Sequence, residues 1–155
     1  MALDLSKRVR RPAQFEEMIR GLVFGSSPAF VTMADLLVYT AALAYHRDVD
    51  RQAFEKASEP IALSVFVNSQ YDGFILMLAA QASGDFNIAD VARTDDVILI
   101  FEEYAAAGLA MLQDVLQRER RRDAVDVLRD LALEAFTTLE KNSDPDFTML
   151  LNELA

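Results

Sequence analysis

The side chains of this chain that could do chemistry are one histidine and two adjacent pairs of carboxylates. His46, the single histidine, ends an alanine-rich apolar segment, where a histidine more often interacts with the helix dipole than acts as a catalyst. Asp95 and Asp96 are sequence neighbours, as are Glu102 and Glu103. Neighbouring side chains point to different faces of a helix, so neither pair is expected to converge on a metal ion. We therefore predict no catalytic, metal-binding or cofactor-binding residues.

The sequence motifs of common enzyme classes are also missing. The chain contains neither H-E-x-x-H nor E-x-x-H, and it has no G-x-x-x-x-G-K-[ST], G-x-G-x-x-G or G-x-S-x-G. It has no cysteine, which excludes disulfides, thiolate metal sites and a cysteine nucleophile. The polar turn at residues 68–73 caps a helix or lines a ligand pocket, and capping is the simpler interpretation. We expect a protein that is not an enzyme.

Basic residues gather in two places of an otherwise acidic chain, whose net charge is −10. Residues 1–11 are expected to form a basic flexible arm, followed by an acidic body. The arginine-rich run at residues 118–122 reads most simply as a solvated collar on a helix, although it could join the arm in a phosphate-binding edge. The candidate nucleic-acid-binding residues are Lys7, Arg8, Arg10, Arg11, Arg118, Arg120, Arg121 and Arg122.

Hydrophobic periodicity predicts an all-α fold. The 155 residues suit one domain, here residues 12–155, and 52% of the residues are hydrophobic. Apolar residues recur at helical spacing in several segments, and Thr32 with Asp35 resembles a capping box. Residues 61–67 have a partial alternating pattern. We expect a compact bundle of five to six helices, with at most one minor short strand pair around residues 61–67. The helices are expected at residues 15–23, 32–45, 71–82, 97–118 and 124–139, with one more turn at 147–154.

Two segments, residues 30–46 and 100–109, are rich in small side chains. Ala41 and Ala42 in the first, and the run from Ala105 to Gly108 in the second, remove bulk where a neighbouring backbone could approach. Small residues at helical spacing predict a tight internal contact. The helix at residues 32–45 is apolar on nearly every face, so we expect it to be the most buried element.

These two segments, together with I-A-L-S-V-F and D-G-F-I-L-M-L-A-A-Q-A-S-G-D, resemble the Dnd-associated protein 4 family. The family comprises small helical proteins encoded beside bacterial DNA phosphorothioation modification and restriction systems. The resemblance covers roughly residues 15–115. Of the family's F-E-E-Y-A-N-x-G-L segment, the chain keeps Phe101 to Ala105, Gly108 and Leu109, but it has Ala106 where asparagine is common.

The resemblance implies a non-enzymatic accessory or regulatory protein of a phosphorothioation-linked restriction and phage-defence system. We expect it to act through protein–protein interaction with other proteins of that system, and to involve DNA only indirectly. Loops and exposed charge commonly carry recognition. The candidate partner-binding residues are Glu102, Glu103, Tyr104, Arg47, Asp48, Asp50 and Arg51.

Other roles stay open at this point. The protein could be DNA-associated, either binding through the basic N-terminal arm or acting as an acidic DNA mimic that blocks a nuclease. An enzyme with an unfamiliar carboxylate or tyrosine site is a third class, and a deep pocket containing Glu103, Tyr104 and His46 would support it. No apolar stretch reaches the roughly 18 residues needed to span a membrane, and no signal peptide is recognised, so we expect a cytoplasmic protein. A homodimer formed through the apolar segment at residues 147–154 is the simplest assembly.

Overall fold

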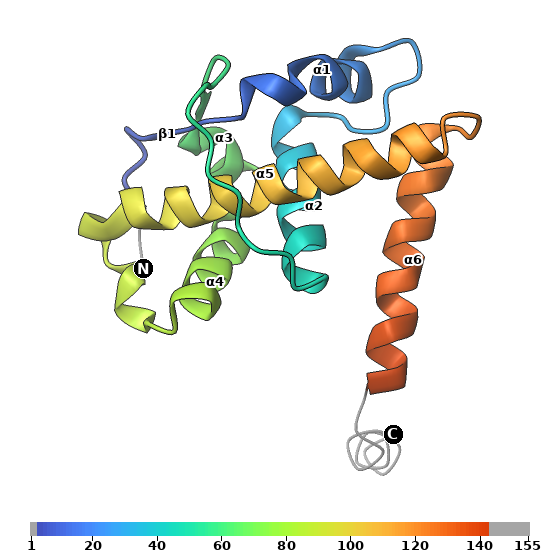
Figure 1. Cartoon of the computed structure of the whole chain (residues 1–155). Helices are drawn as coiled ribbons and strands as arrows, with labels where there is room; N and C mark the ends of the chain where they lie inside the picture. Colours follow the sequence, from blue (N-terminus) through green and yellow to red (C-terminus); the bar gives the residue numbers. More distant parts are fainter. Residues whose placement is uncertain (1–2, 143–155) are drawn as a thin grey trace. The chain divides into compact units, whose positions relative to one another are not determined.

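The computed structural model describes residues 3–142 of the chain, with side chains described through residue 137 (Figure 1). The chain divides into two compact units after Arg118. The sequence indicated a boundary only at residue 11.

The predicted all-α class is confirmed, with six α-helices and one two-stranded sheet among the described residues. The helices are α1 (Glu16–Phe24), α2 (Met33–His46), α3 (Leu63–Asn68), α4 (Asp72–Ser83), α5 (Thr94–Arg118) and α6 (Ala124–Asn142), and the strands are β1 (Arg8–Val9) and β2 (Ile61–Ala62). Short 3-10 turns at Ala13–Phe15, Phe86–Ala89 and Val91–Arg93 lead into α1 and α5.

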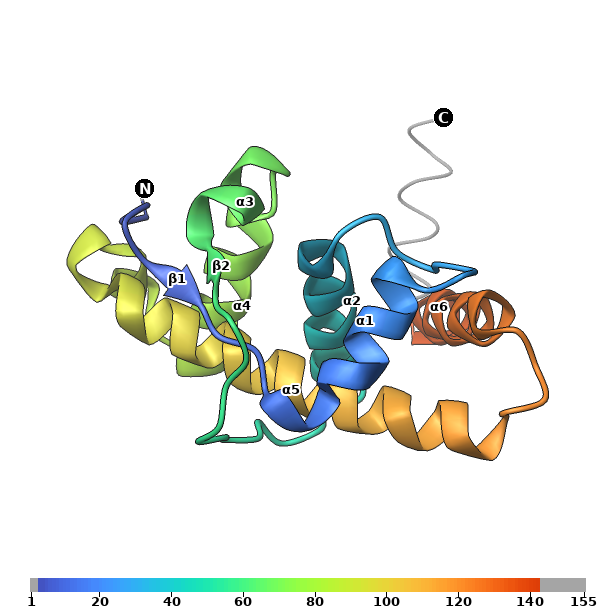
Figure 2. The same cartoon turned by 90° about the horizontal axis from the view of Figure 1, so that it is seen from above.

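The core of the first unit is built where α2 crosses α5 (Figures 1 and 2). A Cβ atom at Gly108 of α5 would lie 1.8 Å from the carbonyl oxygen of Thr40 in α2, so only glycine permits this approach. Ala41 and Ala106 are fully buried. The tight internal contact predicted from the small residues is therefore confirmed, and the structure shows that the two segments make it with each other.

Burial is shared between the two crossing helices. Leu36 and Leu37 of α2 are fully buried, and so are Phe101 and Leu109 of α5. Tyr45, near the end of α2, is 40% exposed. Seven of the 14 residues of α2 are buried, against 12 of the 25 residues of α5, so the prediction that the helix at residues 32–45 would be the most buried element holds by a small margin.

Local signals fix the ends of α2 and α4. The Thr32 hydroxyl accepts a hydrogen bond from the Asp35 amide, and the Asp35 carboxylate accepts one from the Thr32 amide, which completes the predicted capping box. The helix α4 ends at Gly84, whose φ of 68° is left-handed. At the start of α4 the N-cap residue, Tyr71, makes no capping hydrogen bond. Its hydroxyl instead donates to Asp35 over 2.5 Å.

The two strands join the N-terminal segment to the middle of the chain. They pair antiparallel, with Val9 opposite Ile61 (Figure 2). The possible strand around residues 61–67 is thus real for its first two residues, and from Leu63 the chain is helical. Val9 is 1% exposed. Residues 8–9 are therefore held in a sheet and do not form the flexible arm that the basic composition suggested.

The second unit contains α6 within its described part. This helix begins as predicted at Ala124 and extends to Asn142. In the turn before it, Arg122 pairs with Glu119 over 2.7 Å and with Asp130 over 2.5 Å. The helical turn predicted at residues 147–154 lies outside the described residues. None of the helices in the described part of the chain is long and apolar enough to cross a membrane.

Candidate functional site

Glu102 was expected on an exposed face of α5, but it is 3% exposed. Its carboxylate accepts hydrogen bonds from the backbone amide of Arg10, from Arg10 Nε (3.2 Å) and from Arg10 Nη2 (3.0 Å). Burial raises the pKa of Glu102 above its ordinary value, and the contacts with Arg10 only partly oppose this effect. The residue therefore anchors the N-terminal segment to α5 and is not available to a partner.

The other basic residues of the N-terminal segment are also engaged within the first unit. Arg11 is 3% exposed, pairs with Glu16 and donates from Nε to the carbonyl of Glu59 over 3.1 Å. Lys7 pairs with Asp95 over 3.0 Å. The prediction of a free basic arm fails because these cations are paired with carboxylates of the first unit, and the partners of Lys7 and Arg10 are distant in sequence. Arg8 is exposed, and none of the ion pairs among the described residues includes it.

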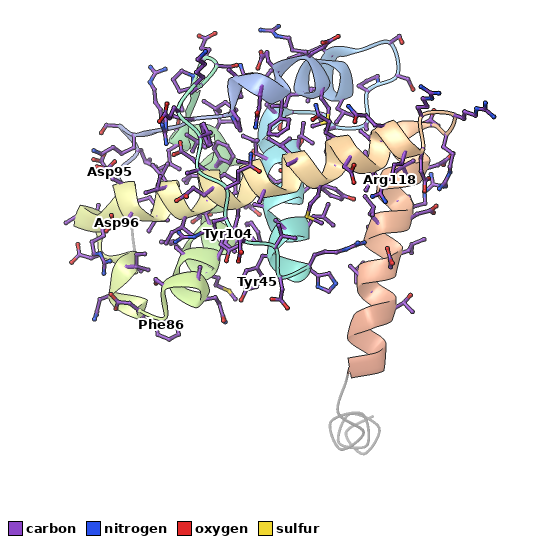
Figure 3. All side chains as sticks on the ribbon, viewed as in Figure 1. Tyr45, Phe86, Asp95, Asp96, Tyr104 and Arg118 are labelled. Atoms are coloured by element: carbon purple, nitrogen blue, oxygen red, sulfur yellow. The ribbon has the colours of Figure 1, made fainter. Side chains whose placement is uncertain are left out.

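The second basic cluster has a similar pattern. Arg118, at the end of α5 (Figure 3), pairs with Asp114 over 3.0 Å, and Arg122 has the two partners given above. Arg120 and Arg121 are exposed and take part in none of the ion pairs found among residues 3–137. Residues 120–122 belong to the second unit and the N-terminal segment to the first. A joint phosphate-binding edge stays a prediction.

Most of the remaining candidate residues meet around one small pocket between the end of α2 and the middle of α5. We name it the tyrosine–aspartate pocket; it has a volume of about 230 Å³ and is lined by Tyr45, Asp48, Val49, Asp50, Arg51 and Tyr104. The rings of Tyr45 and Tyr104 pack edge to face with their centroids 5.7 Å apart (Figure 3). Arg51 reaches Glu103 beside the pocket, with Nη1 3.9 Å from Oε1. Arg47 is exposed at the C-cap of α2 and is not part of the lining.

Backbone hydrogen bonds hold the loop that carries the two aspartates. The amide of Asp48 donates to the Tyr45 carbonyl over 3.2 Å, and the amide of Val49 donates to the Ala44 carbonyl over 3.0 Å. Asp48 adopts a left-handed conformation with a φ of 52°. The amide of Gln52 then donates to the carbonyl of Glu103 over 3.1 Å, which ties the loop to α5. The pocket is therefore formed by a fixed turn, and it requires no rearrangement of the chain to exist.

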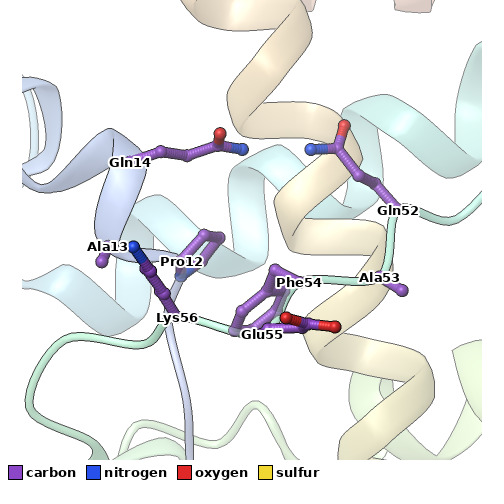
Figure 4. A pocket seen from close by; sticks show the side chains of 8 residues that line it. All are labelled: Pro12, Ala13, Gln14, Gln52, Ala53, Phe54, Glu55 and Lys56. Carbon is purple, nitrogen blue, oxygen red and sulfur yellow. The ribbon is translucent and has the colours of Figure 1, made fainter.

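A second depression is lined in part by the residues that follow in the same loop (Figure 4). It has a volume of about 620 Å³ and lies between residues 12–14 and residues 52–56. The side-chain amides of Gln14 and Gln52 point toward each other across it. The Phe54 ring lies under the guanidinium of Arg10, 4.9 Å from its carbon to the ring centroid. Neither of these two segments has a periodic pattern, so this groove could not be predicted from the sequence.

The pocket that would support an enzyme, one containing Glu103, Tyr104 and His46 together, is not found among the described residues. His46 is exposed in the last turn of α2, and it does not line the pocket that contains Tyr104. Within the described residues, no group of three or more potential ligands could hold a metal ion. The chemistry available at the tyrosine–aspartate pocket is that of aromatic faces and carboxylates, which suits binding.

Comparison with known proteins yields one match. The family model described as DNA sulphur modification system-associated protein 4 matches residues 8–150, most of the chain. No curated protein and no solved structure gives a significant match.

Proposed function

The chain belongs to the DNA sulphur modification system-associated protein 4 family, and from this premise we propose that it is a non-enzymatic accessory or regulatory protein. It serves a phosphorothioation-linked restriction and defence system by binding another protein of that system. The family description supports the association with a DNA sulphur modification system. The non-enzymatic role and the binding mechanism are our proposal.

The observation that carries the proposal is the gathering of predicted partner-binding residues at one exposed place. Asp48, Asp50, Arg51 and Tyr104 line the same pocket, and Glu103 lies beside it. These residues come from a loop and from a helix that are distant in sequence. Loops positioned by a rigid scaffold commonly carry recognition. We therefore assign the partner contact to the surface around this pocket.

The competing proposal, direct DNA binding, has less support. Lys7, Arg10 and Arg11 are engaged in ion pairs within the first unit. A net charge of −10 repels the phosphate backbone. An acidic DNA mimic fits this charge better than a DNA binder does, and it would also act by contacting a basic partner protein.

The test is a pull-down of the modification and restriction proteins encoded beside this chain, at moderate salt and after nuclease treatment to remove bridging DNA. We expect the wild type to recover one of them. The double variant Asp48→Asn with Asp50→Asn should recover roughly tenfold less, equivalent to ~1.4 kcal/mol of binding free energy.

The matched control carries Glu17→Gln and Glu55→Gln, which remove the same charge from exposed carboxylates outside the pocket. It should behave as the wild type. If the wild type recovers none of the neighbouring proteins, the proposed function is wrong. Recovery that depends on DNA would favour the DNA-associated alternative.

A further inference from the structure

The walls of the tyrosine–aspartate pocket have a property that its acidic residues alone would not give. Tyr45 and Tyr104 meet edge to face, with an interplanar angle of 78°. In this packing the planes of the two rings are nearly perpendicular, so their faces point in different directions. Tyr45 is 40% exposed. The face of a tyrosine ring attracts a cation, and arginine is found over such faces more often than lysine.

The charge of the pocket is not compensated by its own residues. Asp48 and Asp50 line it, and neither belongs to an ion pair among the described residues. The cation in the lining, Arg51, faces Glu103. The surroundings of the rings therefore carry an excess of negative charge.

The pocket also lies at the C-terminal end of α2, a helix of 14 residues. The C-terminus of a helix dipole carries partial negative charge and favours a cation nearby. The aromatic faces, the two aspartates and the helix end thus favour the same kind of ligand.

The size of the pocket limits what that ligand can be. Its volume is about 230 Å³, below the roughly 300–1,000 Å³ of pockets that hold small-molecule ligands and cofactors. A single long side chain suits such a space, and the backbone hydrogen bonds of residues 48–52 hold it open in advance.

We infer that the tyrosine–aspartate pocket receives one arginine side chain of the partner protein. This inference rests on the proposed function and adds the chemistry by which the partner is recognised. A guanidinium is planar, stacks on an aromatic ring and can donate to both aspartates at once, whereas the ammonium of lysine is a compact, strongly hydrated charge. The partner's arginine thus stacks on a ring face of the tyrosine pair and donates to Asp48 and Asp50.

The experiment titrates the full chain with blocked arginine, N-acetyl-arginine amide, while the ring resonances of Tyr45 and Tyr104 are followed by NMR. The resonances are assigned with Tyr45→Phe and Tyr104→Phe. Two probes of nearly equal shape or charge serve as comparisons: N-acetyl-citrulline amide, which is neutral, and N-acetyl-lysine amide. We expect saturable shifts of both rings with arginine, at least tenfold weaker binding of citrulline and clearly weaker binding of lysine.

The Asp48→Asn and Asp50→Asn double variant should bind arginine at least tenfold more weakly, and the Glu17→Gln and Glu55→Gln control should bind it as the wild type does. Asparagine tolerates the left-handed conformation of residue 48, so the turn is retained. If the double variant unfolds, Asp50→Asn alone provides the measurement. Equal binding of citrulline and arginine, equal binding of lysine, or unchanged binding by the aspartate variants would each overturn the inference.

The two proposals fail in different ways. Arginine-selective binding without capture of a neighbouring protein would overturn the proposed function alone. Capture of such a protein without arginine selectivity would overturn the arginine pocket alone.

Discussion

At the scale of single residues, the pair formed by Glu102 and Arg10 determines how the N-terminal segment is held. A buried carboxylate is unfavourable unless a cation and hydrogen-bond donors compensate its lost hydration. Arg10 provides both, from its side chain and from its backbone amide. Removing the cation would leave Glu102 buried and without its partner. This destabilises the fold, because an unpaired charge inside the protein has lost its hydration.

Replacing Arg10 with Met is therefore expected to reduce the free energy of unfolding at pH 7 by ~2–3 kcal/mol, below the range for a fully buried pair, because the Arg10 side chain is 43% exposed. The loss should be smaller at pH 5, where the unpaired Glu102 is protonated more easily. Urea denaturation of both proteins at the two pH values measures this. An equal loss at both values would contradict the assignment of Glu102 as the group responsible.

The wild type should also show a pH dependence from Glu102 itself. Because burial raises the pKa of Glu102 in the folded state, the folded protein binds this proton more tightly than the unfolded chain. The contribution of Glu102 to stability is therefore present below its ordinary pKa and is lost as the pH rises through the raised value. Glu102→Gln should remove this dependence, which a series of urea titrations between pH 4 and pH 7 would reveal. If the free energy of unfolding of the Glu102→Gln variant changes with pH as that of the wild type does, another group causes the pH dependence.

At the scale of elements, the crossing of α2 and α5 is set by a glycine. Gly108→Ala would force a Cβ against the Thr40 carbonyl, an atom of the backbone that cannot rotate away. We expect the helices to separate and the free energy of unfolding to fall by about 3 kcal/mol, the upper part of the range for overpacked cores. Thermal melting followed by circular dichroism measures the effect.

Gly21→Ala is the matched control for this substitution. Gly21 also lies within a helix, α1, but a Cβ there would meet no atom within 4 Å. Alanine should stabilise it by ~0.5–1 kcal/mol through helix propensity. If Gly108→Ala melts like this control, the two helices do not approach each other as closely as the structure indicates.

The elements that could be predicted from the sequence are those whose formation depends on residues close together in the chain. The capping box of Thr32 and Asp35, the left-handed Gly84 and the small residues of α5 each act within a few residues of sequence, or mark a close contact by their size. These patterns gave the helices and the contact between α2 and α5. They did not give the helix α3, because its six residues alternate in a way that also suits a strand.

The parts that could not be predicted depend on pairs distant in sequence. Glu102 was expected to be exposed because charged residues are mostly exposed, and nothing near it in sequence indicates Arg10. The same holds for Tyr45, whose ring meets Tyr104 in the candidate pocket. The loop residues Asp48, Asp50 and Arg51 were recognised from their charge alone, without the aromatic walls that give the pocket its chemistry.

At the scale of the whole molecule, the division after Arg118 has a consequence for proteolysis. The turn at residues 119–123 is mostly exposed and contains Arg120, Arg121 and Arg122. Exposed turns between compact units are preferred sites of cleavage. Limited digestion with trypsin should therefore cut first in this turn, ahead of Arg47, Arg51 and Lys56 in the loop that backbone hydrogen bonds hold. Mass spectrometry of early digestion products identifies the site, and a first cut in that loop would contradict the expectation.

The predicted homodimer can be tested with the same fragment. Among the apolar side chains of the described residues, Phe66 is fully buried, whereas Phe86 is 83% exposed (Figure 3). The segment at residues 147–154 lies outside the described residues. If that segment forms the dimer, light scattering should find the full chain dimeric and the fragment ending in the turn monomeric. A fragment with the same oligomeric state as the full chain would exclude the segment as the dimer surface.

The attachment of the N-terminal segment also bears on the order in which the chain acquires its structure during synthesis. Lys7 bonds to a residue 88 positions later, the backbone of Asp4 to one 90 positions later and Arg10 to one 92 positions later. Closing loops of this length is slow, and a ribosome delivers the chain from its N-terminus. The backbone of Asp4 and the side chains of Lys7 and Arg10 therefore have to wait for these partners until α5 has been translated. The helix made last in the first unit, α5, therefore completes the attachment of residues 4–10.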